Sequence, residues 1–516
     1  MTLRLYNQLI ASQSVVRFLG LNIDKKLTYA WHVRDLRERC SKAMNVLKCV
    51  SRMSYGADRK TLLLLYRSLV RSKLDYACFV YESAAKSVKR PLDTIHHAAM
   101  RVVTGAFRTT PVASLLVETN EPPLALRRAM LGMRYTTRIL SFPDHPTYPY
   151  VCSKKLVRLL RGRRQSSAVP FCVRMRKLLE ESSIRPRDIR RFECLRIPPW
   201  ELAEPLLDTT LTRHKKNDTP PEVFRSASLE LIAGYATNEW VRVYTDGSKT
   251  SSGVGCAFVL GDTTRTFTLP SSCSVFTAEL VAILKALCLI EVSEHRKSII
   301  VSDSLSSIQS IAAYNPENAL VQDILLKLTS LREGGKKVVF CWIPSHVGVR
   351  GNEQADEAAK RATQADRRRR FPVPAGDLRQ CISSLIRDKW QDIWNENPSN
   401  KLKRLKPRLG DWQSSSRKSR WEEVALFRLR VGHTLATHRY LLCREEKPKC
   451  ENCDSELSVR HVLESCPGYV DERRHFLGQG DRGLSLCEIL NDESPHIDSV
   501  LKFVREIGFK VVFKPG

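Results

Sequence analysis

Residues 240–269, WVRVYTDGSKTSSGVGCAFVLGDTTRTFTL, decide the fold that this sequence predicts. Three short runs within and just beyond it, WVRVYTDGS, GVGCAFVL and RTFTLP, are separated by glycine, serine and threonine. Runs of this length that are rich in β-branched and aromatic residues, with turn residues between them, are typical of strands joined by tight connections. The stretch therefore predicts three consecutive antiparallel strands.

The sequence after this stretch alternates between helical and strand patterns. Leu280, Ile283, Leu284 and Leu287 of VFTAELVAILKALCLI share one face of a predicted helix. The further predicted elements are strands in KSIIVSDS (297–304) and KKVVFCWIP (336–344), helices around 304–313 and 319–331, and a helix in GNEQADEAAKRAT (351–363). Three strands followed by alternating helices and strands predict an α/β fold, with a mixed five-stranded sheet and flanking helices.

Acidic residues stand at the ends of these predicted strands and at the starts of the predicted helices. Asp246 and Asp303 each follow an apolar strand, Glu279 lies in the first turns of a helix, and Asp356 lies early in the last helix. Taken one at a time, they could be a turn residue, a helix N-cap or surface acids. Taken together they would repel one another, and two Mg²⁺ ions would neutralise them and support phosphodiester hydrolysis.

The blocks that carry these acids resemble a known family. YTDGS, FTAEL, VSDS and IPSHVGVRGNEQADEAAK are similar, in order, to the four signature blocks of type 1 ribonuclease H, within residues 238–366. The resemblance implies an RNase H-like fold in which Asp246, Glu279 and Asp303 ligate metal and Asp356 completes the second site. It implies two Mg²⁺ ions, with Mn²⁺ as an alternative.

The resemblance also implies roles for residues beside the acids. His346 would sit on a mobile loop and help to protonate the leaving 3′ oxygen or to release product, as a histidine titrating near neutral pH can. Gly247 and Ser248 would contact the RNA strand through their backbone, although a plain turn also explains them. An RNA:DNA hybrid would be recognised by its minor-groove shape and by the 2′-hydroxyls.

The composition favours a polyanionic partner. The 516 residues contain 84 Lys and Arg against 55 Asp and Glu, a net charge of +29. Such an excess repels itself unless it meets nucleic acid or another polyanion. No apolar run is long enough to span a membrane, and the N-terminus has no secretory pattern. We therefore expect an intracellular protein that does not bind membranes, in either the nucleus or the cytoplasm, with most of its cysteines reduced.

The residues before the predicted nuclease are expected to be helical over 1–150 and a basic connector over 151–236. VVRFLGLNIDKKLTYAWHV, LLYRSLVRSKLDYACFVY and HHAAMRVVTGAFRTTP resemble the segment after the polymerase palm in reverse transcriptases of jockey-like non-LTR retrotransposons. The paired aspartates of a palm are missing, and Asp58 of YGAD stands alone, so no polymerase activity is predicted. The connector either follows a phosphate backbone or is a solvated linker.

The residues after ADRRRRFPVPAGD, 372–516, are expected to be mainly helical with a small Cys/His cluster. Cys450, Cys453, His461 and Cys466 suit tetrahedral Zn²⁺, and Cys443 could replace one of them. Ordinary reduced thiols are the alternative. Similar clusters occur at the ends of non-LTR element polyproteins.

The leading hypothesis is thus a metal-dependent endoribonuclease that cuts the RNA strand of RNA:DNA hybrids, as part of a retrotransposon-derived protein. One alternative is an inactive remnant that only binds nucleic acid. Another is a transposase or integrase of similar fold, but those enzymes place the glutamate last, whereas Glu279 is second here.

Overall fold

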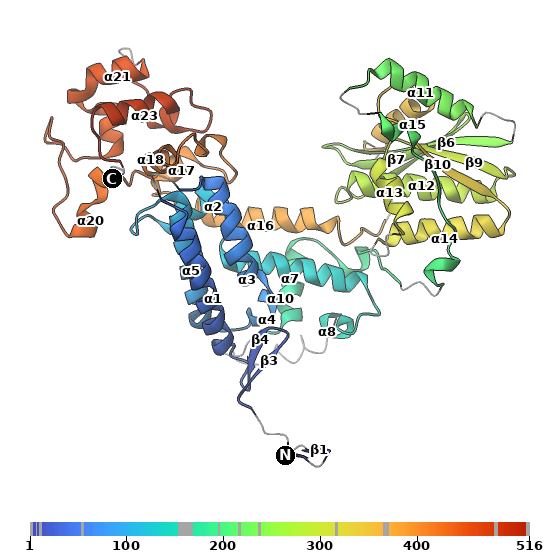
Figure 1. The fold of residues 1–516 in the computed structure, drawn as a ribbon, viewed down its shortest axis with the longest axis horizontal. Helices are drawn as coiled ribbons and strands as arrows, with labels where there is room; N and C mark the ends of the chain where they lie inside the picture. The colour runs from blue at the N-terminus through green and yellow to red at the C-terminus, as the bar shows by residue number, and fades with distance from the viewer. Residues whose placement is uncertain are drawn as a thin grey trace. The chain divides into compact units, whose positions relative to one another are not determined.

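The computed structural model has two compact units (Figure 1). One comprises residues 1–132, 164–171 and 384–516, and the other comprises 133–163 and 172–383. The residues that the structure describes are 4–6, 8–9, 13–52, 56–152, 169–193, 197–214, 218–235, 239–314, 318–364, 371–478 and 483–511. No helix in the described part of the chain is both long and apolar enough to cross a bilayer.

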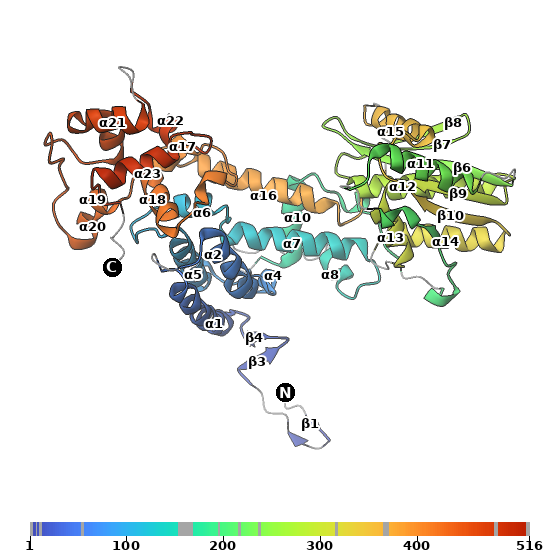
Figure 2. The same cartoon turned by 45° about the horizontal axis from the view of Figure 1, so that its top comes forward.

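A mixed sheet forms the centre of the second unit (Figure 2). Strands β6 (Trp240–Lys249), β7 (Val254–Leu260) and β8 (Thr263–Leu269) form the predicted antiparallel meander. Strands β9 (Lys297–Ser302) and β10 (Lys337–Trp342) continue the sheet on the other side of β6, in parallel. The five strands expected from the sequence are therefore present and mixed in direction as predicted.

A sixth strand, β5 (Leu206–Asp208), pairs in parallel with β10 and completes the order β5-β10-β9-β6-β7-β8. It comes from the stretch expected to be a connector, and so does α11 (Pro221–Ala233), whose Ile232 packs with Ile299 and Val339 of the sheet. A strand this short has no periodicity that the sequence could reveal, and it covers the exposed edge of β10. The basic part of the connector, residues 153–168, lies outside the described residues.

Helices cover both faces of the sheet. A Cβ on Gly247 of β6 would lie 2.6 Å from the amide nitrogen of Glu279 in α12 (Val275–Val292), and one on Gly255 would lie 2.6 Å from the carbonyl of Ala359 in α15 (Arg350–Ala362). Gly255 pairs with Ser248, the neighbour of Gly247, so the two glycines face opposite sides. Helices α13 (Leu305–Ala312) and α14 (Ala319–Glu333) lie on the α12 side, and α11 lies on the α15 side (Figure 1).

The first unit joins the two ends of the chain around one core. Buried residues from its N-terminal part, such as Leu36, Leu92 and Leu115, share a cluster with Val424 and Phe503. The N- and C-terminal helical regions, which the sequence analysis treats as separate, therefore pack together. Its elements are β1 (Arg4–Leu5), β2 (Gln8–Leu9), β3 (Val15–Phe18), β4 (Leu21–Asp24), α1 (Ala30–Cys49), α2 (Arg59–Tyr66), a π-turn (Arg67–Arg71), α3 (Ser72–Asp75), α4 (Cys78–Tyr81), α5 (Lys86–Thr104), α6 (Val112–Thr119), α17 (Lys401–Leu405), α18 (Arg420–Val431), α19 (Leu435–His438), α20 (Tyr440–Cys443), α21 (Val470–Leu477), α22 (Leu486–Leu490) and α23 (Ile497–Glu506).

Helices α7 (Leu124–Ser141) and α16 (Leu378–Asn395) contain the points where the chain passes between the units. The second unit also contains α8 (Tyr148–Cys152) and nearly all of α10 (Phe171–Glu181). Asp58, the lone acid of the YGAD motif, is the N-cap of α2 and accepts a hydrogen bond from the Thr61 amide. Asp58 therefore has a structural role at the start of α2.

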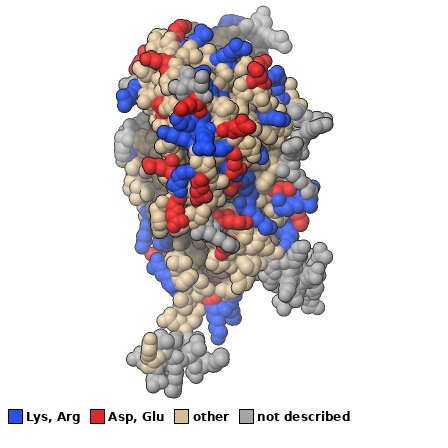
Figure 3. Space-filling model, turned by 90° about the vertical axis from the view of Figure 1, so that its right-hand side faces the viewer, with Lys and Arg blue, Asp and Glu red and all other residues tan. Residues whose placement is uncertain are grey.

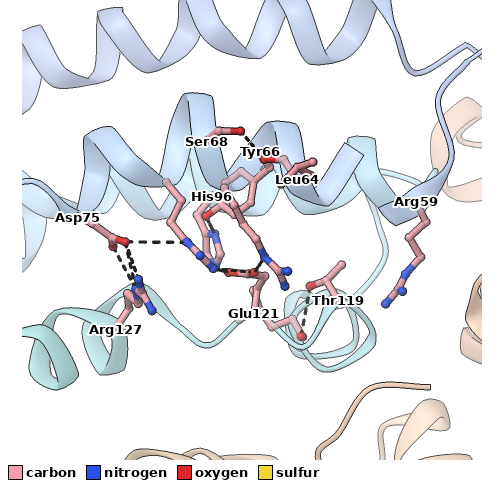
Figure 4. Close-up of polar contacts among 12 residues, drawn as sticks. Arg59, Leu64, Tyr66, Ser68, Asp75, His96, Thr119, Glu121 and Arg127 are labelled. Carbon is pink, nitrogen blue, oxygen red and sulfur yellow. Dashed lines mark hydrogen bonds and ion pairs between the residues drawn. The ribbon is translucent and has the colours of Figure 1, made fainter. Parts of the chain in front are cut away.

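Charged and polar side chains are paired inside the first unit (Figure 4). The carboxylate of Glu121, almost fully buried, accepts hydrogen bonds from Arg67 at 2.6 Å and from Arg71 at 2.8 Å. His96 is 1% exposed, and its Nδ1 lies 2.6 Å from the hydroxyl of Tyr66. Burial lowers the pKa of His96 to about 3, so the folded protein holds this ring neutral.

Acid is therefore expected to destabilise the first unit. In the unfolded chain His96 takes up a proton below about pH 6.5, whereas the folded protein cannot protonate it until about pH 3. The free energy of unfolding should fall by about 1.4 kcal/mol per pH unit below pH 6.5 from this residue alone. His433 and His438, whose pKa values burial lowers to about 3 and about 4, add to the effect.

Urea unfolding between pH 7 and pH 5 measures this slope. In His96→Gln the slope should be shallower than in the wild type, whereas replacing the exposed His475 with glutamine should leave it unchanged. Equal slopes in both variants would show that His96 does not titrate on unfolding.

Candidate active site

Two neighbouring parallel strands bring Asp246 and Asp303 to the same edge of the sheet. Thr245 of β6 is in register with Ser302 of β9, and an aspartate follows each of these two residues. The sequence pattern predicts that Asp246 follows its strand, but β6 continues past it, and Asp246 pairs with Ala257 of β7. Asp246 therefore lies where the parallel pairing ends and the antiparallel pairing goes on.

Helix α12 supplies the third carboxylate. The helix begins after Ser274, whose side chain accepts a hydrogen bond from the Thr277 amide, and Glu279 follows in the next turn. Gly247 lets the first turn of α12 approach β6 closely, because any side chain there would meet the backbone of Glu279. The role of Gly247 in packing is thus visible in the structure, whereas its expected contact with RNA remains a prediction.

The carboxylates of Asp246, Glu279 and Asp303 form a compact triad whose ligand atoms all lie within 4.8 Å of one another. Asp246 and Glu279 are each 5% exposed. Burial and the neighbouring carboxylates of Asp303 and Asp356 raise the pKa of Asp246 to about 7. Burial and, to a smaller extent, the nearby charge of Asp246 raise the pKa of Glu279 well above its usual range. Burial also raises the pKa of Asp303. The site concentrates negative charge that the protein itself does not neutralise.

The residues present fit a divalent cation. The Oε2 atom of Glu279 is buried without a hydrogen-bond partner. Among the described residues, no lysine or arginine forms an ion pair with any of the three carboxylates of the triad. A buried acidic group without a counter-charge is costly, and oxygen ligands at this spacing are those that Mg²⁺ prefers. The triad therefore has the donor set of a magnesium site.

Asp356 lies in a neighbouring group with His346 and Glu353 rather than in the triad itself. Its Oδ2 atom accepts a hydrogen bond from Lys360 at 2.6 Å and lies 3.8 Å from Nδ1 of His346. The His346 side chain is 65% exposed, and its backbone has a φ of +57°. Asp356 is still near enough to raise the pKa of Asp246, so the two groups form one acidic region.

Three residues of this region, Glu353, Asn352 and Trp342, were not singled out from the sequence. Glu353 stands one helical turn before Asp356, a spacing that could have indicated a shared face. Asn352, 3% exposed, points its Nδ2 atom to Oδ2 of Asp303 at 3.4 Å, and its Oδ1 atom is buried without a partner. The indole of Trp342 donates to the carbonyl of Asp303 at 3.1 Å. Asn352 and Trp342 thus hold Asp303 in place.

Gly247→Ala is expected to disrupt the triad. The added methyl would lie 2.6 Å from the Glu279 amide nitrogen and 2.9 Å from atoms of Ala278, so α12 must move away from β6. Forcing such a methyl into a packed region costs about 1–3 kcal/mol of stability. We expect weaker stabilisation by Mg²⁺ in thermal unfolding. Gly376→Ala, in the same unit, with a φ outside the left-handed region and no atoms near the added methyl, is the control for changing a glycine.

A second group of metal-ligating side chains lies in the first unit. The ligand atoms of Cys450, Cys453, His461 and Cys466 all lie within 4.8 Å of one another. The sulfurs of Cys450 and Cys466 are 3.6 Å apart, and Sγ of Cys453 is 3.2 Å from Nε2 of His461. Ligands around tetrahedral zinc with Zn–S bonds of about 2.3 Å have similar separations. Cys443 is exposed and outside this group.

The charge on the side of the molecule drawn in Figure 3 does not by itself locate a binding face. On the side of the molecule in Figure 3, lysines and arginines are interspersed with aspartates and glutamates and do not form one continuous basic patch. The net charge of +29 therefore supports a polyanionic partner without indicating where it binds.

Comparisons with known proteins agree with the fold of the sheet region in the second unit. Residues 238–364 match the RNase H family. The chain is also 22% identical over 129 residues to the retrovirus-related Pol polyprotein from type-1 retrotransposable element R1 4 of Nasonia vitripennis. That similarity covers 25% of this chain and 33% of the relative, so the chain matches about a third of that protein's length. Residues 238–364 are therefore an RNase H domain, in a chain distantly similar to a non-LTR retrotransposon polyprotein.

Proposed function

We propose that the RNase H domain hydrolyses the RNA strand of RNA:DNA hybrids endonucleolytically, with Mg²⁺ or Mn²⁺ at the acidic region, as part of a retrotransposon-derived protein. The observation that carries this proposal is the convergence of Asp246, Glu279 and Asp303 in one buried place without a basic partner among the described residues. The partner in this proposal is the RNA:DNA hybrid itself. The proposed location is inside the cell.

The side chains divide the work of the reaction. Asp246, Glu279 and Asp303 would hold metal. Asp356 would complete the second metal site once its hydrogen bond with Lys360 is broken. The bound ions would supply a polarised water and charge stabilisation on the leaving oxygen. Asn352 keeps the Asp303 carboxylate oriented. His346, exposed beside Asp356, would carry a proton to the leaving 3′ oxygen.

Substrate contacts would come from the backbone near the triad. Gly247 and Ser248 lie directly after Asp246 on β6, and their peptide groups would contact the RNA strand near the scissile phosphate. Selection for a hybrid would then depend on minor-groove shape and on the 2′-hydroxyls.

We further propose that Cys450, Cys453, His461 and Cys466 bind one structural Zn²⁺. All four positions are filled by protein side chains, which leaves none open for substrate, and closed sites of this kind stabilise folds. The buried Val462 and Leu463, between two of the ligands, belong to the core of the first unit. Zinc would therefore hold the C-terminal helices to that core.

The decisive test supplies the purified full chain with a fluorescent RNA:DNA hybrid, with Mg²⁺ or with EDTA, beside Asp303→Asn. We expect cleavage of the RNA strand only with wild-type protein and metal, and none of double-stranded DNA. Cleavage that survives EDTA or the substitution would remove the metal-dependent assignment. No cleavage by the intact protein would leave the alternative of an inactive nucleic-acid binder.

A further inference from the structure

A large cleft opens in the second unit on the far side of α12 from the acidic triad. Its volume is about 1120 Å³, above the roughly 300–1,000 Å³ typical of sites for small molecules. The residues that line it include four arginines and several aromatic side chains, among them Arg138, Arg379, Phe142 and Phe192. Most of them lie outside residues 238–364, so the cleft is largely built by segments that flank the RNase H domain.

The lining has the chemistry of a nucleic-acid strand site. The lining contains four arginines, of which Arg190 is already paired with Asp323, and one aspartate. The carboxylate of that aspartate, Asp377, accepts a hydrogen bond from the Ser274 amide. Aromatic side chains also line the cleft, and the ring centroids of Phe142 and Phe192 are 5.4 Å apart. Guanidinium groups bind phosphates, and aromatic rings stack on bases of any sequence.

Backbone hydrogen bonds tie the walls of the cleft together. The amide of Phe192 bonds to the carbonyl of Ser141, and the amide of Arg190 bonds to the carbonyl of Val373 at 2.8 Å. Arg190 is also held by an ion pair with Asp323 and lies over the ring of Phe371. Three segments far apart in the sequence are thus fixed around one space, so a ligand would find the site already formed.

The position of the cleft relates it to the triad. Thr277 lines the cleft, and Glu279, two residues later in α12, belongs to the triad. Two residues turn a helix by about 200°, so the two side chains leave opposite faces of the same turn. A helix is about 10–12 Å across, which corresponds to about three nucleotides at 3.4 Å each.

We propose that this cleft binds a single-stranded extension of the nucleic-acid substrate that continues beyond the duplex at the triad. The arginines would contact its phosphates, and the aromatic rings would stack on its bases. This proposal rests on the proposed function only for the presence of a duplex at the triad. The binding of a single strand can be measured without any cleavage.

Binding is tested with the full chain carrying Asp303→Asn, in EDTA, and a fluorescein-labelled oligothymidylate of about twelve nucleotides. Arg138→Glu with Arg379→Glu should weaken binding at least about tenfold and flatten the salt dependence of the affinity. Arg213→Glu with Arg265→Glu changes the charge equally at two exposed arginines that do not line the cleft, and should have a much smaller effect. An equal loss of affinity for the oligonucleotide in both double variants would overturn the proposal.

A second measurement does not depend on how the variants fold. Photo-crosslinking of an oligonucleotide that contains 5-iodouracil to the wild-type chain should label peptides that contain residues 134–145, 190–192 or 276–277. Crosslinks confined to other peptides would overturn the proposal.

Cleavage assays separate the cleft from the proposed function. With active protein, a hybrid that carries a single-stranded extension of about six nucleotides or more should be cut faster than a blunt hybrid. The ratio of the two rates should fall toward one in Arg138→Glu with Arg379→Glu. Hybrid cleavage without any effect of the extension would refute the cleft alone, whereas strand binding at the cleft without hybrid cleavage would refute the nuclease alone.

Discussion

Replacing Asp246 with asparagine is expected to lower hybrid cleavage by about 10⁴-fold or more, the size of loss found when one acidic member of a catalytic unit is removed. Asp246 lies on β6, the strand that pairs with both β7 and β9, and its carboxylate lies within 4.8 Å of those of Glu279 and Asp303. Asparagine keeps the shape of the side chain but removes its charge. The loss should therefore come from weakened metal binding and not from altered packing.

The same substitution should stabilise the metal-free protein. Burial and neighbouring carboxylates raise the pKa of Asp246 from 3.8 to about 7, so ionising it in the folded state is unfavourable. Removing that charge is expected to raise the free energy of unfolding at pH 8 in EDTA by roughly 2–4 kcal/mol. Added Mg²⁺ should stabilise the wild type and have little effect on the variant.

Asp262→Asn is the matched control, because Asp262 is an exposed aspartate in the turn between β7 and β8 of the same domain. It should change neither cleavage nor stability in EDTA. If Asp246→Asn keeps a tenth of the wild-type activity, or is less stable than the wild type without metal, the triad is not the metal site.

Removing zinc from the first unit is expected to unfold its C-terminal part. The protein as purified should contain one zinc per chain by elemental analysis. Zinc binding in small sites supplies folding free energy of about 10 kcal/mol or more, so a strong chelator should lower the melting temperature markedly. Cys450→Ser, at a buried ligand whose sulfur lies 3.6 Å from that of Cys466, should reproduce this effect without chelator.

Cys443→Ser is the control for this experiment, because Cys443 is an exposed cysteine outside the group of four. It should keep the zinc content and the melting temperature of the wild type. A chain that is purified without zinc, or a Cys450→Ser variant as stable as Cys443→Ser, would show that these residues are ordinary reduced thiols.

The sequence by itself was enough to predict the RNase H domain. Its strands and helices carry strong local patterns, and a carboxylate beside each pattern marks the edge where the elements meet. Because parallel strands end at the same edge of a sheet, Asp246 and Asp303 could be expected together. The Cys/His group could be predicted for a different reason, because ligands close in sequence need little tertiary structure to converge.

Only the tertiary structure revealed features that depend on contacts between distant segments. Strand β5 is too short to have a detectable pattern, and it forms because the edge of β10 is available to pair with it. The grouping of Asp356 with His346 and Glu353, and the hold of Asn352 on Asp303, depend on how α15 packs on the sheet. The cleft beside α12 joins residues from 134 to 379. Local patterns record the preferences of neighbouring residues, whereas a site built from distant segments exists only after packing has brought them together.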